Sequence, residues 1–411
     1  MKVICDRGAL LDAVNLVASI VPARTPTPAL SCIKFTARKT ASGGEVIIAG
    51  TDAESSLSIT ITHVDVQQPG AAAIPADKLR AIVSAEDGEP TLTIETDGDQ
   101  VHIRGQNAHF RVFGFPPADF PPLPDLQQTL SGEAGGAPKT VFTQNAGSLM
   151  ELVSRTAFAT ARETSRYAIN GVLLKRDGKK LEMVATDGRR LALSRAQVTG
   201  AGGGKDKDNV TCIIPTKALG VLQKIARDPE ETVRVAITDT RIFFAFEPGA
   251  AGEESPKKGK GVSGAEPAAR AILSSTLVEG TFPPYEDVIP KEQDKKITTS
   301  RDELSSAVRK ASVLTNEESR GVRMAFTSSD KRLKLSSRAP EMGESDIHVE
   351  LSSYEGEDIE ISFNPTFITD VLKVVTEQEV IVELKAPNKP GLIRSSTNDF
   401  VYVVMPVNLP T

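Results

Sequence analysis

The feature that most restricts the fold of this chain is a pattern that occurs three times in its sequence. An apolar run, a proline and a helical spacing of apolar residues follow one another at Ala73–Val83, Ile213–Leu222 and Ser362–Leu372. Proline is favoured at the start of a helix, so each segment predicts a strand that leads into a helix. The segments lie roughly 140 to 150 residues apart, which is the length of a domain and too long for a solenoid repeat. The chain is therefore expected to contain three copies of one domain.

A second helix is predicted upstream of the first in every copy. Asp6–Ala18, Asn145–Ala157 and Ser300–Ser312 each begin with a residue that caps helices, and Ser300 with Glu303 has the spacing of a capping box. Short strand-like runs separated by Gly and Asp turns occupy the rest of each copy. The predicted fold class is α+β, with three repeated domains that each hold two helices and about eight short strands.

Proline-rich segments mark the points where the copies join. Phe115–Pro124 closes the first copy and Phe282–Pro290 lies at the next boundary, and such segments are extended and semi-rigid. Ser131–Thr140 is expected to be a flexible linker, and Thr199–Asn209 and Pro248–Ala269 are expected to be loops because they hold almost nothing to bury. These boundaries predict domains at 1–126, 138–289 and 290–411.

The composition excludes several classes of protein. The 411 residues include neither an N-terminal signal peptide nor an apolar run long enough to span a membrane, which favours a cytoplasmic protein. Cys5, Cys32 and Cys212 are scattered and odd in number, and the four histidines include no pair with ligand spacing. Neither a disulfide framework nor a metal or other cofactor is therefore expected. The net charge of −6 argues against a surface that is basic throughout, but it leaves room for a local basic patch.

The stretch from Ser165 to Arg195 combines strands and turns. Two strand-like runs, Ala168–Leu174 and Leu181–Ala185, flank a turn at Asp177-Gly178, and a second turn follows at Thr186–Gly188. Local sequence thus predicts a small β-meander here.

Three arginines of this stretch, Arg166, Arg189 and Arg190, lie beside the apolar Ile169 and Leu191. Two interpretations are open. The arginines are solvated charges on an ordinary meander, or they rim an exposed apolar groove, which is the form of a peptide-docking site.

The predicted helices carry more basic than acidic residues on their polar faces, against the trend of the whole chain. Such faces are either ordinary solvated surfaces or surfaces suited to phosphate contacts that do not depend on base sequence and that weaken with salt. The basic residues are Arg7, Lys78, Arg80, Arg155, Lys217, Lys224, Arg227, Arg301, Arg309, Lys310 and Lys373.

Catalytic motifs are missing from the sequence. It contains no dinucleotide fingerprint, no P-loop and no nucleophile elbow. Asp187 could serve a hydrolase as its catalytic carboxylate, although Asp-Gly is foremost a turn signal. The hydrolase therefore remains one hypothesis.

Several motifs together resemble one family. The segments Ala185–Ala192, Leu314–Glu317 and Arg320–Arg323, and the C-terminal Tyr402–Leu409, are similar to those of the bacterial DNA polymerase III beta subunit family, the sliding clamps. The resemblance covers the whole chain. It implies the DNA clamp fold, in which crescent-shaped protomers of three domains form a ring as a head-to-tail dimer and helices line the hole.

In function, the resemblance implies a processivity factor. Such a ring encircles double-stranded DNA, slides without sequence specificity and holds the replicative DNA polymerase at a high effective concentration. The implied partners are the polymerase, the clamp loader and repair factors, which bind through short peptide motifs, and a second copy of the chain. No bond is made or broken, so the protein is expected not to be an enzyme. The alternatives are a clamp-like scaffold that does not encircle DNA and the hydrolase that uses Asp187.

The matching motifs also imply a partner-peptide groove. It would take a short motif ending in Leu and Phe, with arginines along its rim. Asn408 stands where a basic residue is common in the family, and Pro410-Thr411 extend the tail. The implied groove residues are Arg166, Ile169, Thr186, Gly188, Arg189, Arg190, Leu191, Pro290, Phe367, Val403, Met405, Pro406, Val407 and Leu409.

Dimer and DNA contacts are implied in the same way. The dimer contact would involve Phe110 and Val112 in the first domain of one protomer and Val313 and Leu314 in the third domain of the other. Asp77 falls where some relatives have a basic residue, so neighbouring basic residues would take its place. The predicted DNA-binding residues are Arg24, Lys78, Arg80, Arg162, Lys217, Lys224, Arg227, Arg309 and Lys373.

Overall fold

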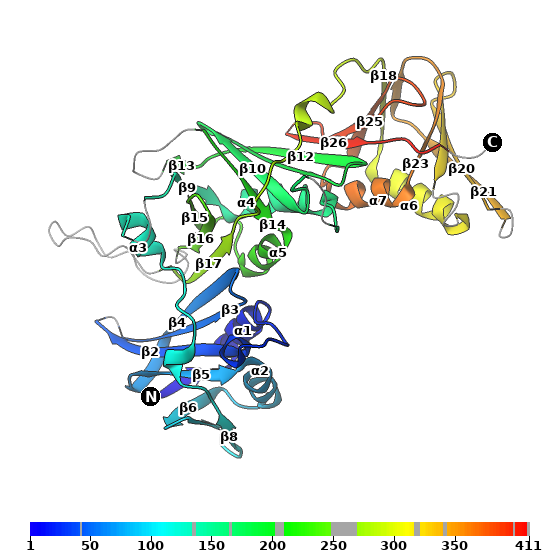
Figure 1. Ribbon diagram of the computed structural model, residues 1–411. Helices are drawn as coiled ribbons and strands as arrows, with labels where there is room; N and C mark the ends of the chain where they lie inside the picture. Colours follow the sequence, from blue (N-terminus) through cyan, green and yellow to red (C-terminus); the bar gives the residue numbers. More distant parts are fainter. Residues whose placement is uncertain are drawn as a thin grey trace. The chain divides into compact units, whose positions relative to one another are not determined.

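The structure of the chain is a computed structural model (Figure 1). It describes residues 1–41, 43–133, 137–163, 167–201, 209–247, 269–315, 321–339, 343–397 and 399–408. The chain divides into two compact units. The first unit comprises Met1–Met150, Val198–Val210 and Lys217–Leu277, and the second comprises Glu151–Gln197, Thr211–Thr216 and Val278–Thr411.

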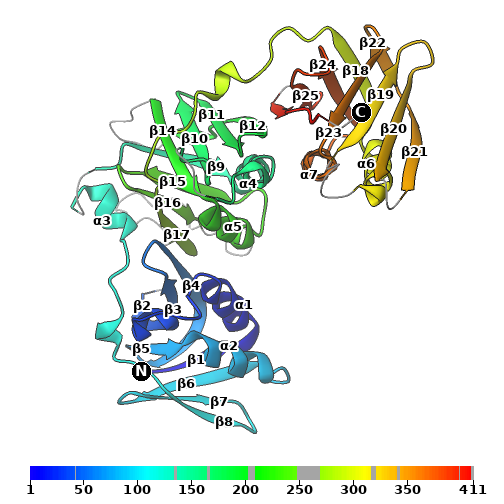
Figure 2. The same ribbon diagram turned by 45° about the vertical axis from the view of Figure 1, so that its right-hand side comes forward.

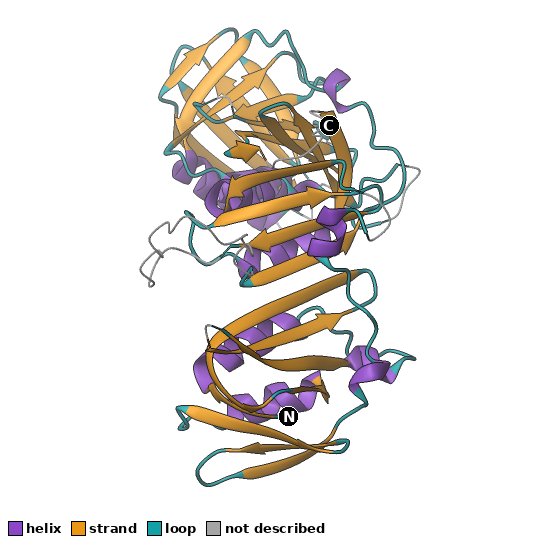
Figure 3. Cartoon of the chain, turned by 90° about the vertical axis from the view of Figure 1, so that its left-hand side faces the viewer, coloured by secondary structure: helices purple, strands orange, loops and turns teal. Residues whose placement is uncertain are grey.

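The first unit is built on one large antiparallel sheet with helices packed on it (Figure 3). Its main strand order is β13-β9-β15-β16-β17-β4-β1-β6-β7-β8, and β2 pairs with β3 and β5 beside this path. Helix α1 packs against α2 and against β3 and β4. The helices are α1 (Arg7–Ala18), α2 (Ala76–Ala85), α3 (Leu126–Ser131), α4 (Ala146–Ser154) and α5 (Thr216–Ile225), the last two also extending into the second unit. The strands are β1 (Lys2–Asp6), β2 (Cys32–Thr40), β3 (Gly43–Thr51), β4 (Ser55–Gln68), β5 (Gly70–Pro75), β6 (Thr91–Asp97), β7 (Gln100–Arg104), β8 (His109–Phe113), β9 (Thr140–Asn145), β13 (Gly200–Ala201), β15 (Thr232–Ile237), β16 (Arg241–Phe246) and β17 (Ala271–Thr276).

The second unit contains two antiparallel sheets. Their strand orders are β14-β10-β11-β12-β26-β25-β24-β18-β22 and β21-β20-β19-β23. Helices α6 (Arg301–Ala311) and α7 (Pro365–Val374) pack side by side, as Figure 2 shows. The strands are β10 (Gly171–Asp177), β11 (Lys180–Thr186), β12 (Arg190–Gln197), β14 (Asn209–Pro215), β18 (Lys295–Ser300), β19 (Val322–Thr327), β20 (Arg332–Ala339), β21 (Gly343–Glu350), β22 (Ser353–Glu355), β23 (Ile359–Phe363), β24 (Glu379–Leu384), β25 (Gly391–Arg394) and β26 (Phe400–Val404).

The α+β repeat predicted from the sequence is confirmed, and local side-chain bonds explain where its helices begin. Asp6 Oδ1 accepts a hydrogen bond from Ala9 N (2.8 Å) and caps α1. Ser300 Oγ accepts from Glu303 N (3.4 Å) and caps α6. In α7 the proline is the first helical residue and Asn364 is the cap, whereas Pro75 itself precedes the first residue of α2. The side chains of Asp6, Ser300 and Asn364 each satisfy an N–H that the helix leaves unpaired, whereas Pro75 makes no such bond.

Three local expectations are wrong. Helix α3 was not expected beside the predicted linker; Asp125 caps it, and Leu126 packs with Ala236 and Phe243 in an apolar cluster. The strand expected from residue 168 begins only at Gly171. Residues 200 and 201, expected in a loop, pair with β9. Residues 202–208 and 248–268 of the two expected loops lie outside the described residues.

Neighbouring copies of the repeat are joined by strand pairing at two places, which we call the first and second seams. In the first seam β17 pairs with β4, and in the second seam β26 pairs with β12. In both, the last strand of one copy pairs with the second strand of a hairpin in another copy (β3–β4 or β11–β12). The corresponding strands that remain are β8, the last strand of the first copy, and β21, the second strand of the β20–β21 hairpin. Among the described residues, each of these two has a single neighbour in its sheet.

Candidate functional site

The turn between β11 and β12 is held in one conformation by its own side chains. Asp187 Oδ1 accepts hydrogen bonds from the backbone N of Arg189 (2.9 Å) and of Arg190 (3.0 Å), and Thr186 Oγ1 donates to Arg190 O (2.6 Å). Gly188 has a φ of 85°, in the left-handed region that favours glycine. Asp187 therefore serves the turn, as an Asp-Gly turn signal predicts, and the hydrolase hypothesis loses its carboxylate.

Arg190 is an anchor beneath this turn and not a residue of the rim, so the expectation that it lines the rim is wrong. Its side chain is only 10% exposed and donates to Asp370 Oδ2 (2.9 Å), Asp187 Oδ2 (3.0 Å) and Phe158 O (3.0 Å). The guanidinium carbon also lies 4.5 Å from the centre of the Phe367 ring. Burial acts to lower the pKa of Arg190, but the hydrogen bond to Asp370 and the neighbouring groups outweigh it, so that the pKa is raised.

Tyr402 fixes the other side of this cluster. Its hydroxyl donates to Phe367 O (2.9 Å), and its ring centre lies 5.8 Å from that of Phe158. Burial raises the pKa of Tyr402, against the effect of the nearby Arg190 charge. Because Tyr402 is in β26, the second seam holds the β12 turn and helix α7 together within this unit.

An apolar layer covers the face of the sheet next to the turn. Leu191 and Val403 are directly paired across β12 and β26 and are almost fully buried in this layer. Val278, Phe282 and Ile289, from the segment that connects the second and third copies, pack on it. Exposed apolar side chains adjoin the layer along the chain, namely Tyr167 (42% exposed) before Ala168, Val288 (47%) before Ile289, and Met405 (39%) after Val404. A strip of apolar surface next to charged groups is what short peptide motifs bind.

The structure brings most of the predicted groove residues together in this place. Thr186, Gly188, Arg189 and Leu191 come from the β11–β12 turn, and Met405 N bonds Arg189 O (2.9 Å). Val407 N bonds Ser362 O (2.9 Å), which carries the C-terminal segment past the end of β23. Ile169 is buried just ahead of β10, Phe367 and Pro406 are half-buried, and Arg189 is exposed. Arg166, Leu409 and the Pro410-Thr411 extension lie outside the described residues.

Pro290 lines a polar hollow with Arg195, Arg394, Glu383 and Val401, and the last of these belongs to the apolar layer. Arg195 bonds Asp399 O (2.8 Å), at the opposite end of the β12–β26 pair from Arg190 and Val404. Ile289, which packs on the apolar layer, lines the same hollow, so the assignment of Pro290 to the groove stays a prediction.

Sequence reasoning missed Phe158, Asp370, Tyr167 and Val288. The exposed valine and tyrosine could have been found from their place next to predicted apolar runs. Asp370 could not, since it is separated by 180 residues from Arg190 and meets it only through the strand pairing of the second seam.

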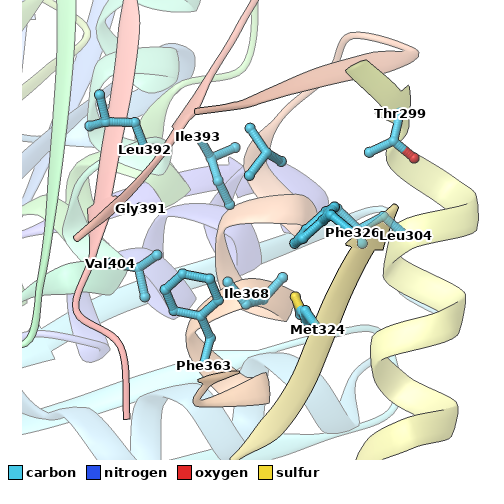
Figure 4. A pocket seen from close by; sticks show the side chains of 11 residues that line it. Thr299, Leu304, Met324, Phe326, Phe363, Ile368, Gly391, Leu392, Ile393 and Val404 are labelled. Carbon is cyan, nitrogen blue, oxygen red and sulfur yellow. The ribbon is translucent and has the colours of Figure 1, made fainter. Parts of the chain in front are cut away.

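A small cavity lies in the core of the third copy (Figure 4). Its volume is about 20 Å³, room for no more than a water or a methyl group, so it is not a peptide site. Thr299 lines it, and its buried Oγ1 has no hydrogen-bond partner among the described residues. The lining residues are Thr299, Leu304, Met324, Phe326, Phe363, Ile368, Val382, Gly391, Leu392, Ile393 and Val404.

The predicted DNA-binding residues are on the surface. All nine side chains are exposed. Four of them are paired with carboxylates: Lys78 with Asp77 (3.2 Å), Arg227 with Asp12 (3.6 Å), Lys373 with Asp370 (3.1 Å), and Lys217 with Asp52. Arg155, also grouped with the basic helix residues, is buried and bound to Glu151, Glu377 and Asp399, so its assignment to a basic surface is wrong.

Two of the predicted dimer residues lie in the edge strand β8, and the other two lie in the 3-10 turn that follows α6. Phe110 and Val112 are half-buried in β8, and Leu314 is half-buried and Val313 is 68% exposed in the 3-10 turn Ser312–Leu314. The described side chains contain no group of three or more His, Cys, Asp or Glu suited to a metal ion. No helix in the described part of the chain is long and apolar enough to cross a membrane. Burial raises the pKa of Cys5 to about 12, so this thiol is unreactive.

Fold and site together define a binding protein built from three repeated domains. Three family models cover most of the chain: the N-terminal domain of the DNA polymerase III beta subunit matches residues 1–124, the central domain 144–251 and the C-terminal domain 286–408. The chain belongs to the DNA polymerase III beta subunit family.

Named relatives agree with this assignment. The chain is 29% identical over 405 residues to the beta sliding clamp of Pseudomonas putida, covering 98% of this chain and 99% of that one. It is 27% identical over 410 residues to the Escherichia coli beta sliding clamp, covering 100% of both. Among solved structures, the Pseudomonas aeruginosa sliding clamp bound to griselimycin matches with a TM-score of 0.83 at 27% identity, and the Bacillus subtilis clamp with 0.83 at 26%, each over 100% of both chains. The protein is accordingly a processivity factor of the replicative DNA polymerase and has no catalytic role of its own.

Proposed function

We propose that this chain acts in the cytoplasm as a homodimeric ring around duplex DNA and tethers its partners through the surface between Arg189, Leu191, Val288 and Met405. The observation that carries the proposal is the Arg190 anchor, which fixes a turn beside exposed apolar side chains. Domains at 1–126, 138–289 and 290–411 are part of the proposal. The expected ligand is a short peptide with two apolar side chains, supplied by the polymerase, the clamp loader or repair factors.

The open sheet edges support a head-to-tail ring. The first and second seams leave β8 and β21 as the remaining strands of the same two kinds, and in the part of the chain that the structure describes each has a strand partner on one side only. Unpaired edges favour addition of another strand, so β8 of one protomer would pair with β21 of the other protomer. Two such pairings close a symmetric dimer, in agreement with the dimeric rings of the family.

The repeat also supports the predicted dimer contact. Phe158 and Val313 both lie in the 3-10 turn region that follows the first helix of their copy, while Tyr402 and Phe110 lie in the last strand of theirs. Across the second seam Phe158 and Tyr402 have ring centres 5.8 Å apart. The same geometry between two protomers would bring Val313 of one next to Phe110 of the other. The exposed side chain of Val313 would then be buried, which favours association.

The basic residues would hold DNA loosely. Four of the nine predicted contacts already pair with carboxylates, so a phosphate has to replace an existing partner. Each new phosphate contact then adds little binding free energy, and its strength depends on the salt concentration. Weak contacts of this kind allow sliding, because retention comes from the closed ring and not from affinity.

Retention on DNA of different topology tests the proposal. Loaded on nicked circular DNA by a clamp loader, the protein should stay bound at high salt and be released when the circle is cut. Val313→Asp should abolish dimerisation and retention but keep peptide binding, because Val313 is exposed outside the groove. Val288→Asp is the matched variant that should lose peptide binding and keep the dimer. Equal retention on linear and circular DNA would refute encirclement and leave a scaffold that binds partners only.

A further inference from the structure

The polar hollow lined by Pro290 has a volume of about 540 Å³ and belongs to the second unit. Three cations line it, against a single carboxylate. The cations are Arg195 of β12, Arg394 of β25 and Lys291 of the connecting segment, and the carboxylate is Glu383 of β24. The hollow therefore favours a negatively charged ligand, although the whole chain has a net charge of −6.

Both arginines are held by a carboxylate through Nε alone. Arg195 Nε donates to Glu182 Oε1 (2.7 Å), and Arg394 Nε donates to Glu383 Oε2 (2.9 Å). Among the described residues, the Nη groups of these two arginines have no hydrogen-bond partner. The side chains are 43% and 23% exposed, so a ligand can reach them. Paired N–H donors of a guanidinium are the geometry that binds a carboxylate through both of its oxygens.

The surroundings of the hollow fix these donors in place. Tyr285, which is buried, donates from its hydroxyl to Glu182 Oε2 (3.3 Å) and so supports the carboxylate that holds Arg195. Gln293 Nε2 donates to Pro390 O (2.9 Å) and ties the connecting segment to the third copy. Lys291 is exposed and has no ion-pair partner in the described part of the chain. Donors held in this way lose little freedom when a ligand binds.

The hollow lies on the same face of the sheet as the apolar layer. Leu191 and Arg195 are four residues apart in β12, so they share a face and lie about 13 Å from each other. Val401 pairs with Leu193 on one side and with Arg394 on the other, and it belongs both to the layer and to the lining of the hollow. A chain bound beside Leu191 therefore reaches the hollow within about four extended residues.

We propose that the hollow binds acidic side chains of the partner peptide. A Glu or Asp that lies about two to four residues from the apolar pair of the peptide would contact Arg195, Arg394 and Lys291. The inference rests on the peptide groove proposed above and adds a charge preference to it. A carboxylate fills the open Nη donors, whereas a basic residue at that position meets three like charges.

A series of peptides with one apolar motif tests this preference. Every peptide carries the same Leu and Phe, with Glu-Glu or Gln-Gln placed two to four residues before them or after them. Exposed ion pairs contribute about 1.5- to 5-fold each, so for one of the two placements the Glu peptide should bind about 3- to 20-fold more tightly. Fluorescence anisotropy at low salt measures this, and the difference should shrink as salt is added. Equal affinities of Glu and Gln peptides at both placements would overturn the inference.

Two substitutions assign the preference to the hollow. Arg195→Gln combined with Arg394→Gln should abolish it and leave the affinity for the Gln peptide unchanged, which also shows that the variant is folded. The matched control is Arg323→Gln, at an exposed arginine of the same unit that pairs with Glu360 (3.3 Å), and it should keep the preference. A preference that survives the double substitution would overturn the inference, because other cations would then bind the acidic residues.

Disulfide trapping locates the acidic residue. The native cysteines are buried, so Lys291→Cys should form a mixed disulfide with a peptide that has Cys in place of one Glu. Arg323→Cys is the control for random collision. Trapping by Lys291→Cys that is no faster than trapping by Arg323→Cys would place the peptide elsewhere and refute the proposed contact.

The outcomes for the two peptides separate this inference from the proposed function. If neither the Glu nor the Gln peptide binds the wild-type chain, the groove is refuted and the charge preference with it. If the Gln peptide binds and Glu adds nothing, the groove stands and only the role of the hollow is refuted.

Discussion

Replacing Arg190 by methionine should destabilise the second unit and disorder its binding turn. Methionine keeps the apolar contact with Phe367 but removes the donors to Asp187, Asp370 and Phe158 O. Hydrogen bonds to charged groups contribute about 1.5–3 kcal/mol each, and breaking a fully buried ion pair costs about 3–5 kcal/mol.

The structure reduces that cost. Asp370 is 22% exposed and keeps Lys373, and Asp187 keeps its two backbone donors, so water and other partners replace part of the loss. We expect Arg190→Met to lower the free energy of unfolding by about 2–4 kcal/mol. Arg190→Lys should recover a minor part, because one ammonium group cannot reach three acceptors.

Tyrosine fluorescence in a urea titration isolates this effect. The chain has no Trp, and its four tyrosines, at positions 167, 285, 354 and 402, all belong to the second unit. A change in the midpoint without a change in the slope then reports the stability of that unit. The exposed Arg189→Met is the control and should change it by less than about 0.5 kcal/mol. If Arg190→Met costs no more than Arg189→Met, Arg190 is a rim residue and the reasoning fails.

Three further outcomes are expected. Gly188→Ala should lower the free energy of unfolding by about 1 kcal/mol, because the φ of Gly188 is 85°. Gly220→Ala should raise it by about 0.5–1 kcal/mol, because Gly220 lies inside α5 with open space where a Cβ would be. Equal effects of the two variants in thermal melts would contradict this. Thr299→Val should raise the free energy of unfolding by about 1 kcal/mol, seen as a higher urea midpoint, since it removes a buried hydroxyl without a described partner. A lower midpoint would mean that a water binds to this hydroxyl. Burial acts to raise the pKa of Asp399, but bonds from Thr397 and Ser395 and the Arg155 charge outweigh it, so the folded pKa lies below 3.8. Its contribution to stability is therefore complete above 3.8 and lost as pH falls through the folded value, and Asp399→Asn should show a shallower loss in acid melts.

The predictable parts of the site were those that depend on near neighbours in the chain. The Asp187-Gly188 turn is held by bonds that span two or three residues, and Asp6 and Ser300 cap their helices three residues away. Such bonds form whatever the rest of the molecule does, so residue type and spacing are enough to predict them.

The sequence by itself determined the threefold repeat, its helices and caps, and the turn that carries the arginines, because local hydrogen bonds and apolar periodicity specify these. Only the tertiary structure decided that Arg190 anchors the site from below, that Pro290 lines a hollow with Arg195 and Arg394, and that β12 pairs with β26. The physical reason is that strand pairing is equally possible for many edges of similar pattern. The choice among them depends on burial and charge contributed by residues that are distant in sequence, such as Asp370 for Arg190.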